Sequence, residues 1–313
     1  INPSLQLRRV WSGGKKQASF NVSHRRSEAD LSNKIHYRDD SQPLVVRLGN
    51  PNLKGRMSTD LSANYSSNFG KHQQMFSVTA SANYVHRATA QSKSYDEATG
   101  VYTYMPKNVG GAYHYNGSIN YSSALDKNRY WTWQTNFNAD YNHSVDYAML
   151  SGETESHRNV VNTTTLKEGA FLQFNKNTLN LRAVGDVNWR HSTGKMRDFT
   201  TLNVWDYHYG LIASYTIPVL KTTVAADGTM YSRRGYGSNS LNTDDFVLNA
   251  SLSQPLFKGK LIARVEAFDL LHQISATHYD VSAQGRVETW YRSLPHYVMF
   301  HLVYHWNKNP KKL

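Results

Sequence analysis

The chain has 313 residues, with 35 Lys and Arg against 23 Asp and Glu, a formal net charge of +12 and no cysteine. The lack of cysteine excludes a disulfide scaffold, a cysteine-ligated metal site and a thiol nucleophile. No run of about 18 apolar residues occurs, which excludes membrane-spanning helices, and 12% aromatic residues are too many for a disordered chain.

The first elements along the chain are predicted to be β-strands, because apolar and polar residues alternate with a period of two. A first strand is expected near 4–10, followed by a short turn at 12–15. Two further strands follow at 57–65 and 76–84, where one parity is apolar and the other carries Ser, Asp, Asn and Thr. Each such strand has one apolar face and one polar face.

The alternation is clearest between residues 131 and 147. One parity contains Trp131, Trp133, Thr135, Phe137, Ala139, Tyr141, His143, Val145 and Tyr147. The other parity, from Thr132 to Asp146, is uncharged polar or acidic. The same division occurs at 113–122, 179–190 and 298–306.

The connections between these strands have two lengths, which alternate along the chain. Short turns are expected at 12–15, 68–71, 126–128, 175–177, 219–220 and 258–260. Long polar connections are expected at 27–55, 88–110, 148–162, 192–203, 232–244 and 273–295, with an extra hairpin at 95–105 and a helical turn near 28–34. This pattern predicts an antiparallel up-and-down meander of about 13 strands with all short turns at one end.

A soluble antiparallel sandwich or barrel has the same alternation, so the chemistry of the two strand faces decides between a soluble and a membrane protein. The polar face is rich in Asn, Ser, Thr and Gln, as the wall of a water-filled lumen is. Tyr and Trp lie near strand ends on the apolar parity, as in the aromatic girdles of transmembrane barrels. The expected girdle residues are Trp131, Trp133, Tyr147, Trp189, Trp205, Tyr207, Tyr304 and Trp306. We therefore expect an all-β, antiparallel up-and-down transmembrane β-barrel.

Two stretches resemble a known family. Gly49-Asn50-Pro51-Asn52-Leu53-Lys54, which leads into the strand at 57–65, looks like a segment common in the barrels of TonB-dependent receptors, and the last strand at 294–307 is similar to the terminal strand of that family's outer-membrane β-barrel branch. The resemblance implies that residues 1–313 are a single barrel domain in the bacterial outer membrane. It implies nutrient uptake, with outer-membrane lipid and, through a plug, the TonB complex as partners and a surface lipoprotein as a further candidate.

The first strand runs into a short turn and the final strand is expected to end on the short-turn side. An odd number of such strands cannot close antiparallel on itself. We therefore expect the chain to be the C-terminal portion of a larger, for example 22-stranded, barrel whose plug and N-terminal strands are absent.

No catalytic motif occurs, so an enzyme and a cofactor are not expected. His301 and His305 share a strand face but are about 13 Å apart, too far for one metal ion. The basic pairs are scattered over turns and loop bases, which argues against a nucleic-acid surface. The long connections, which we expect on the outer side, hold the candidate ligand contacts Arg38, Asp39, Asp40, Tyr95, Tyr102, Tyr104, Arg233, Arg234 and Tyr236.

Two other functions stay open at this point. A structural or adhesive surface barrel has the same strands and loops without a transport role. A soluble β protein would stay monodisperse without detergent.

Overall fold

The computed structural model describes residues 2–70, 73–150, 152–196, 199–237, 239–273, 277–282, 285–290 and 296–306. These residues form an all-β protein, as predicted, with one four-residue helix, α1 (Leu31–Lys34), and two 3₁₀ turns at Asn239–Leu241 and Phe257–Gly259. None of the described helices has the length and apolar character needed to cross a membrane. Parts of the predicted connection 273–295, and the tail 307–313, lie outside the described residues.

Thirteen strands form one continuous path of neighbours, which agrees with the predicted number. In spatial order they are β1 (Ser4–Trp11), β2 (Lys16–Ser27), β5 (Arg56–Phe69), β6 (Gln74–Asp96), β8 (Ala112–Ala124), β9 (Trp131–Ala148), β10 (His157–Lys176), β11 (Leu179–Gly194), β12 (Leu202–Thr216), β13 (Thr223–Arg234), β14 (Asp244–Leu256), β15 (Leu261–Phe268) and β18 (Tyr297–Tyr304). Every pair along this path is antiparallel.

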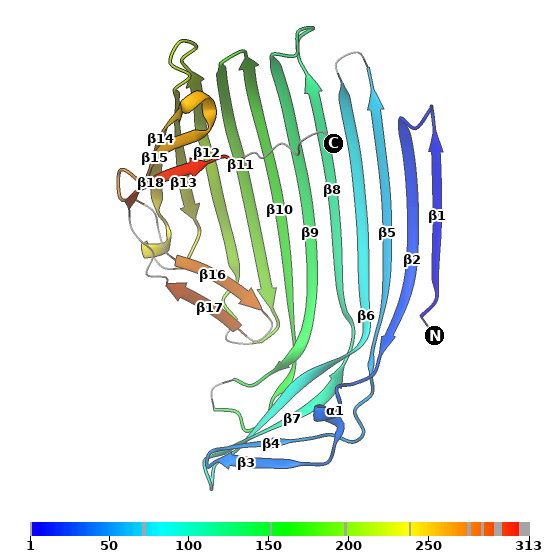
Figure 1. Ribbon diagram of the computed structural model, residues 1–313. Helices are drawn as coiled ribbons and strands as arrows, with labels where there is room; N and C mark the ends of the chain where they lie inside the picture. The colour runs from blue at the N-terminus through cyan, green and yellow to red at the C-terminus, as the bar shows by residue number, and fades with distance from the viewer. Residues whose placement is uncertain are drawn as a thin grey trace, which may run out of the picture.

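Short and long connections alternate along this path, as the sequence predicts. The tight turns lie at one end of the sheet and the long connections at the other (Figure 1). In the first turn, Ser12, Gly13 and Gly14 all have positive φ, and the two glycines take this conformation without steric cost. The register is unbroken over most of the path, with one bulge beside Met57.

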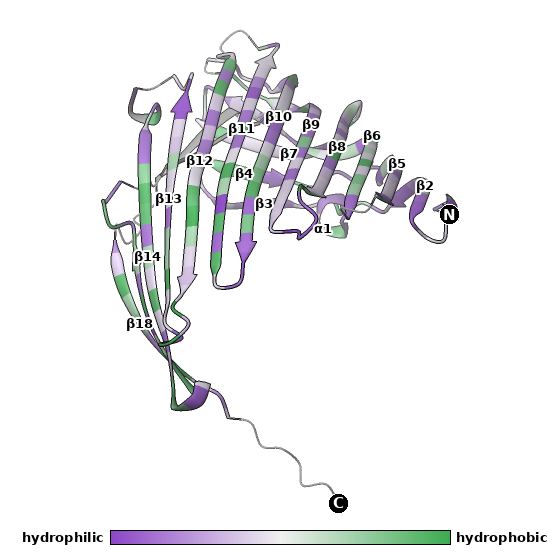
Figure 2. Ribbon diagram, turned by 90° about the horizontal axis from the view of Figure 1, so that it is seen from above, coloured by the Kyte–Doolittle hydropathy of each residue, from purple (hydrophilic) through white to green (hydrophobic). Residues whose placement is uncertain are grey.

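The sheet is open. β1 and β18 each have a single neighbour, and no pairing joins them among the described strands. Viewed along its strands, the path curves into an arc with β2 and β18 near its two ends (Figure 2). The structure is therefore a curved wall with two free edges.

The long-loop end carries a second, smaller group of strands that the sequence only partly predicts. The connection 27–55 contains α1, β3 (Arg38–Gln42) and β4 (Val45–Leu48), and 88–110 is mostly strand, because β6 continues to Asp96 and pairs with β7 (Val101–Val109). β4 also pairs with β7, in parallel. We call β3, β4, β7 and the 88–96 part of β6 the loop sheet. It crosses the end of the wall in Figure 1.

The last long connection also contains a hairpin. β16 (Thr277–Ser282) pairs with β17 (Gly285–Trp290) and forms a separate two-stranded sheet. The sequence pattern gave no strand here.

The two faces of the wall differ in chemistry. Hydrophobic and hydrophilic residues alternate along β11 and β12 (Figure 2). On the apolar parity, large side chains are unusually exposed, including Leu211 at 68% and Phe300 at 64%. On the polar parity, Asn83 donates to Asp60 at 2.7 Å and Asn249 donates to Asp227 at 2.8 Å. Small clusters of buried apolar residues lie toward the long-loop end, one of them formed by Ala90, Val109, Val145 and Val160.

The segment 49–55 fastens the loop sheet to the wall. The Asn50 side chain donates to the Pro106 carbonyl at 2.8 Å, and Lys54 N–H donates to Asn108 Oδ1 at 2.8 Å. Asn108 Nδ2 donates back to the Lys54 carbonyl at 2.7 Å, while Leu53 is only 2% exposed. We call these contacts the clasp. Gly49 belongs to it, because a Cβ at this position would collide with the Ile35 carbonyl oxygen.

Gly49→Ala tests the tightness of the clasp. The added methyl group has to displace the Ile35 backbone, and such overpacking costs about 1–3 kcal/mol. We expect faster trypsin cleavage between residues 28 and 55 of the detergent-folded protein. Gly117→Ala is the matched control, since a Cβ there meets nothing within 4 Å. Equal cleavage of both variants would contradict this account of Gly49.

Candidate functional site

The loop sheet brings together six of the nine predicted ligand-contact residues. β3 carries Arg38, Asp39 and Asp40, the end of β6 carries Tyr95, and β7 carries Tyr102 and Tyr104. Tyr95 pairs with Tyr102 in the register of β6 and β7, and Val45 of β4 pairs with Tyr102 from the other side. Residues that are more than 60 positions apart in the sequence (Arg38 and Tyr102) thus share one small sheet.

An aromatic and cationic group lies on this sheet at the hairpin end of β6 and β7. The Tyr95 and Tyr102 ring centroids are 4.6 Å apart. Lys93 Nζ lies 4.1 Å from the centroid of the Tyr102 ring and 5.8 Å from that of Tyr104. Aromatic faces stack on sugars and apolar ligands, and the ammonium group adds a hydrogen-bond donor. The sequence analysis did not identify Lys93, although the alternation of Lys93 and Tyr95 on one strand offered a signal.

The charges of β3 are largely balanced within the loop sheet. Arg38 Nε lies 3.2 Å from Asp40 Oδ2, and Arg47 lies 4.0 Å from Asp39. Hydrogen bonds from the Ser41 side chain and backbone, with a further contribution from Arg47, lower the pKa of Asp39. A site on this sheet therefore has aromatic surface and paired charges, with no large excess of either sign on β3.

Arg234 and Tyr236 lie in a different network, at the end of β13 and in the loop that follows it. Arg234 Nη2 binds both carboxylate oxygens of Asp244, at 2.8 and 2.6 Å. The Tyr236 hydroxyl donates to Asp206 at 2.9 Å, and Tyr236 packs against buried Leu202, Val204 and Leu241. These contacts hold Tyr236 and Leu241 against β12 and Arg234 against Asp244 of β14.

The third predicted contact of this group, Arg233, pairs in register with Asp206, and its backbone N–H donates to the Thr243 carbonyl at 2.9 Å. Ligand binding by Arg233, Arg234 and Tyr236 stays a prediction.

The expected girdle residues lie in two regions of the apolar parity, with one exception. Near the short turns, the Trp131 ring lies 4.8 Å from that of Phe174, and Tyr304 lies 6.3 Å from Trp306. Trp133 follows on the same face of β9. Toward the long-loop end, the ring centroids are 6.0 Å apart for Trp189 and Trp205 and 6.1 Å apart for Trp205 and Tyr207.

Tyr147 is the exception. It packs against the buried cluster of Ala90, Val109, Val145 and Val160, beside the loop sheet. Lys107 Nζ lies 5.9 Å from its ring centroid. Contact of any of these aromatic residues with a membrane stays a prediction.

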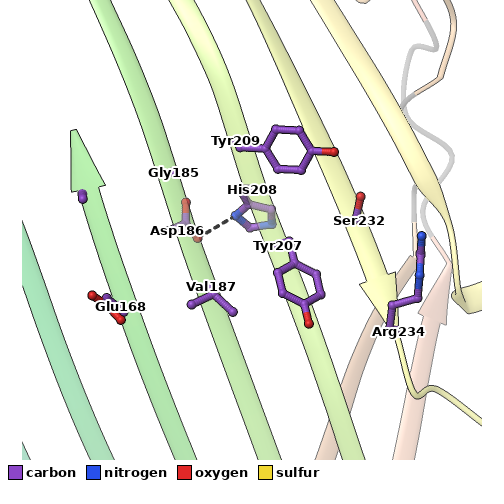
Figure 3. A pocket seen from close by; sticks show the side chains of 10 residues that line it. Glu168, Gly185, Asp186, Val187, Tyr207, His208, Tyr209, Ser232 and Arg234 are labelled. Atoms are coloured by element: carbon purple, nitrogen blue, oxygen red, sulfur yellow. Dashed lines mark ion pairs between the residues drawn. The ribbon is translucent and has the colours of Figure 1, made fainter. Parts of the chain in front are cut away.

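A cavity of about 480 Å³ opens on the apolar parity across β10, β11, β12 and β13. Ala170 and Gly185, which have little or no side chain, leave space between Glu168, Val187 and the tyrosine rings at 207 and 209. Figures 1 and 2 show that the sheet is concave toward the viewer of Figure 1. In Figure 3 the strands β10 to β13 run from left to right, the reverse of their order in Figure 1, so Figure 3 views the sheet from its convex side. The cavity lies on this convex face.

The cavity combines groups that the sequence analysis did not connect. Glu168 pairs in register with Val187, and Val187 with Tyr207, so one row crosses three strands. Behind this row, on the polar parity, His208 Nδ1 lies 3.0 Å from Asp186 Oδ1 (Figure 3). A glutamate between Leu166 and Ala170 on the apolar parity of β10 was the sequence signal for this place.

No group of three or more His, Asp or Glu side chains is placed to hold a metal ion within the part of the chain that the structure describes. The expectation that the protein uses no metal or cofactor stays a prediction.

An antiparallel up-and-down wall with an apolar convex face, a polar concave face, short turns at one end and long connections at the other defines the class of transmembrane β-barrel proteins. Residues 1–180 match the family model described as outer membrane protein beta-barrel family, and the chain belongs to this family. No curated protein and no solved structure matches the chain.

Tyr236 provides a pH test of the loop network. Burial, followed by the negative charge and hydrogen bond of Asp206, raises the pKa of Tyr236 to about 12. The Tyr236 hydroxyl therefore stays protonated below this pH, and its stabilising contact with Asp206 is lost as the pH rises from about 10, the value of an ordinary tyrosine, through about 12. We expect the tyrosinate absorbance of the native protein minus that of Tyr236→Phe to rise near pH 12.

In Asp206→Asn the rise should move part of the way down toward about 10, the value of an ordinary tyrosine, because burial remains while the charge of Asp206 is lost. A difference curve centred near 10 in the native protein would show that Tyr236 is not buried against Asp206.

Proposed function

We propose that the chain forms the wall of a TonB-dependent transporter in the bacterial outer membrane and takes up a nutrient. The observation that carries this proposal is the direction of the two free edges. β1 runs toward the first short turn, and β18 runs toward the same end, where His305 N–H donates to the Lys260 carbonyl. The two edge strands are therefore oriented alike.

The shared orientation of β1 and β18 limits the number of strands that a closed barrel can have. Pairing β1 with β18 would be parallel, whereas bacterial single-chain barrels are antiparallel and have an even number of strands. An odd number of further strands closes the barrel, and nine of them give the 22 strands of a plugged transporter. These strands and the plug are part of the proposal.

The width of such a barrel favours transport over a purely structural role. Barrel diameter grows with strand number, and above about 16 strands the interior is a channel or needs a plug. The concave face carries polar side chains that suit either. In this proposal the loop sheet contacts the nutrient, the plug contacts the TonB complex, a surface lipoprotein assists capture, and the protein is not an enzyme.

Two measurements on native protein extracted from outer membranes with a non-ionic detergent test the proposal. The intact species should be much heavier than 35.7 kDa, because it contains the closing strands and the plug. In planar bilayers it should conduct poorly until urea releases the plug, and then conduct strongly. Low conductance before and after urea would support the alternative, a structural or adhesive barrel.

Membrane insertion itself can be tested at two neighbouring positions on opposite faces. Ala139 lies between Gly117 and Leu166 on the apolar parity, and Ser118 lies between Thr79 and Asn138 on the polar parity. Arginine at mid-depth on a lipid-facing surface costs about 2–4 kcal/mol. We expect Ala139→Arg to lower the unfolding free energy in lipid vesicles by that amount and Ser118→Arg to change it little. The reverse order would mean that the apolar face does not contact lipid.

A further inference from the structure

We propose that a basic cavity at the long-loop end of β2 and β5 binds a phosphate-bearing anion. The cavity has a volume of about 540 Å³. Its charged lining residues come from three separate segments and are Arg26, Glu28, Lys34, Lys54, Arg56 and Arg87. Neither the loop sheet nor the cavity of Figure 3 includes this place.

The charge balance of the cavity is strongly one-sided. Five cationic side chains line it and one carboxylate, Glu28, accompanies them. Within the described ranges, no ion pair involves any of these five cations, although the neighbouring Arg25 pairs with Asp60 at 3.1 Å. In contrast to β3, where arginines and aspartates compensate each other, this cavity leaves its positive charge available to a ligand.

The backbone that carries these side chains is held in place by other contacts. The clasp fixes Lys54 through both its N–H and its carbonyl group, and Leu53 beside it is buried. Arg87 Nε donates to the Gly55 carbonyl at 2.7 Å, which fixes the guanidinium group while using one of its five N–H donors. The Arg87 guanidinium therefore loses little side-chain entropy when it binds a ligand.

The residue types favour phosphate among anions. Arginine presents a planar set of donors that matches two phosphate oxygens at once, and lysine adds a mobile point charge. A phosphate monoester carries close to two negative charges near neutral pH, which suits several cations better than a single carboxylate does. The volume lies within the range of small-molecule pockets and leaves room for the group esterified to the phosphate.

The position of the cavity admits a ligand from the membrane or from solution. His24, two residues before Arg26, hydrogen-bonds Thr59 at 3.1 Å, and His86, next to Arg87, hydrogen-bonds Thr59 at 2.8 Å. The Tyr84 ring lies 4.8 Å from that of His86, so an aromatic and histidine band borders the site on the wall. Tyrosine belts lie at the level of lipid headgroups in transmembrane barrels, while Arg26, Lys54 and Arg56 of the cavity are exposed.

Two probes distinguish these sources. The full chain in a neutral detergent is titrated with inorganic phosphate by calorimetry, and in a second arm it is incubated with phosphatidylcholine nanodiscs with and without phosphatidic acid. Binding of both probes, or of either one, supports the site, and the pattern identifies a lipid headgroup or a soluble phosphate compound as the ligand. Binding of neither probe overturns the proposal.

Variants locate the binding. Arg26→Gln with Arg56→Gln should weaken binding at least tenfold, because two charged donors are lost. Lys15→Gln with Lys16→Gln removes the same charge at the short-turn end and should change affinity less than twofold. Equal loss in both double variants would mean that binding follows the net charge of the protein, and the proposed site would be wrong.

The variant Glu28→Gln tests whether weaker binding by the arginine variants results from damage to the fold. It removes the only carboxylate of the cavity, so binding should tighten severalfold, and damage to the fold cannot produce this result. Unchanged or weaker binding by a correctly folded Glu28→Gln protein would contradict the proposal. The site does not depend on the proposed transport function, since it can exist in a barrel of either role.

Discussion

Each strand of the wall is held by the pairing of its backbone N–H and C=O groups with those of its neighbours. In a lipid environment no water replaces a missing partner, so every strand needs a neighbour on both sides. Eleven strands of the thirteen-strand path have two neighbours, while β1 and β18 have one. Because both edge strands run toward the short turns, only strands of opposite direction can continue the antiparallel pattern. The direction of β1 and β18 therefore determines the direction of any strand that pairs with either of them.

The same pairing gives the two faces their separate chemistry. With unbroken register, a period of two in the sequence becomes two continuous surfaces, so a side chain's parity decides whether its neighbours are Ala139 and Leu211 or Asp227 and Asn249. Acidic groups on the polar face are satisfied by amides and histidines, as in the pairs Asp60–Asn83 and Asp186–His208. Some side chains depart from this division, among them Glu168.

The parts of the fold that depend on local sequence could be predicted, and those that depend on distant contacts could not. Alternation and turn residues sufficed for the approximate number of strands along the path and for the alternation of tight turns with long connections. The parallel pairing of β4 with β7 could not be predicted, because it depends on how two separate long connections fold together. The extension of β6 to Asp96 could not be predicted either, because its far end pairs with β7 and with residues 153–156 instead of with a strand of the wall. The sequence was enough to name the aromatic residues of the candidate site. It was not enough to predict that they lie together in the loop sheet, or that residues 26, 54 and 87 line one cavity.

The clasp also imposes an order on folding. Asn50 and Pro106 are separated by 56 positions, and Lys54 and Asn108 by 54. Closing so long a segment in an unstructured chain is entropically costly, but the hairpin of β5 and β6 and that of β6 and β7 shorten it to a few flexible residues. Both hairpins must therefore precede the clasp. We expect a late step in which the loop sheet docks, and this end of the wall is then the first to open when the protein unfolds.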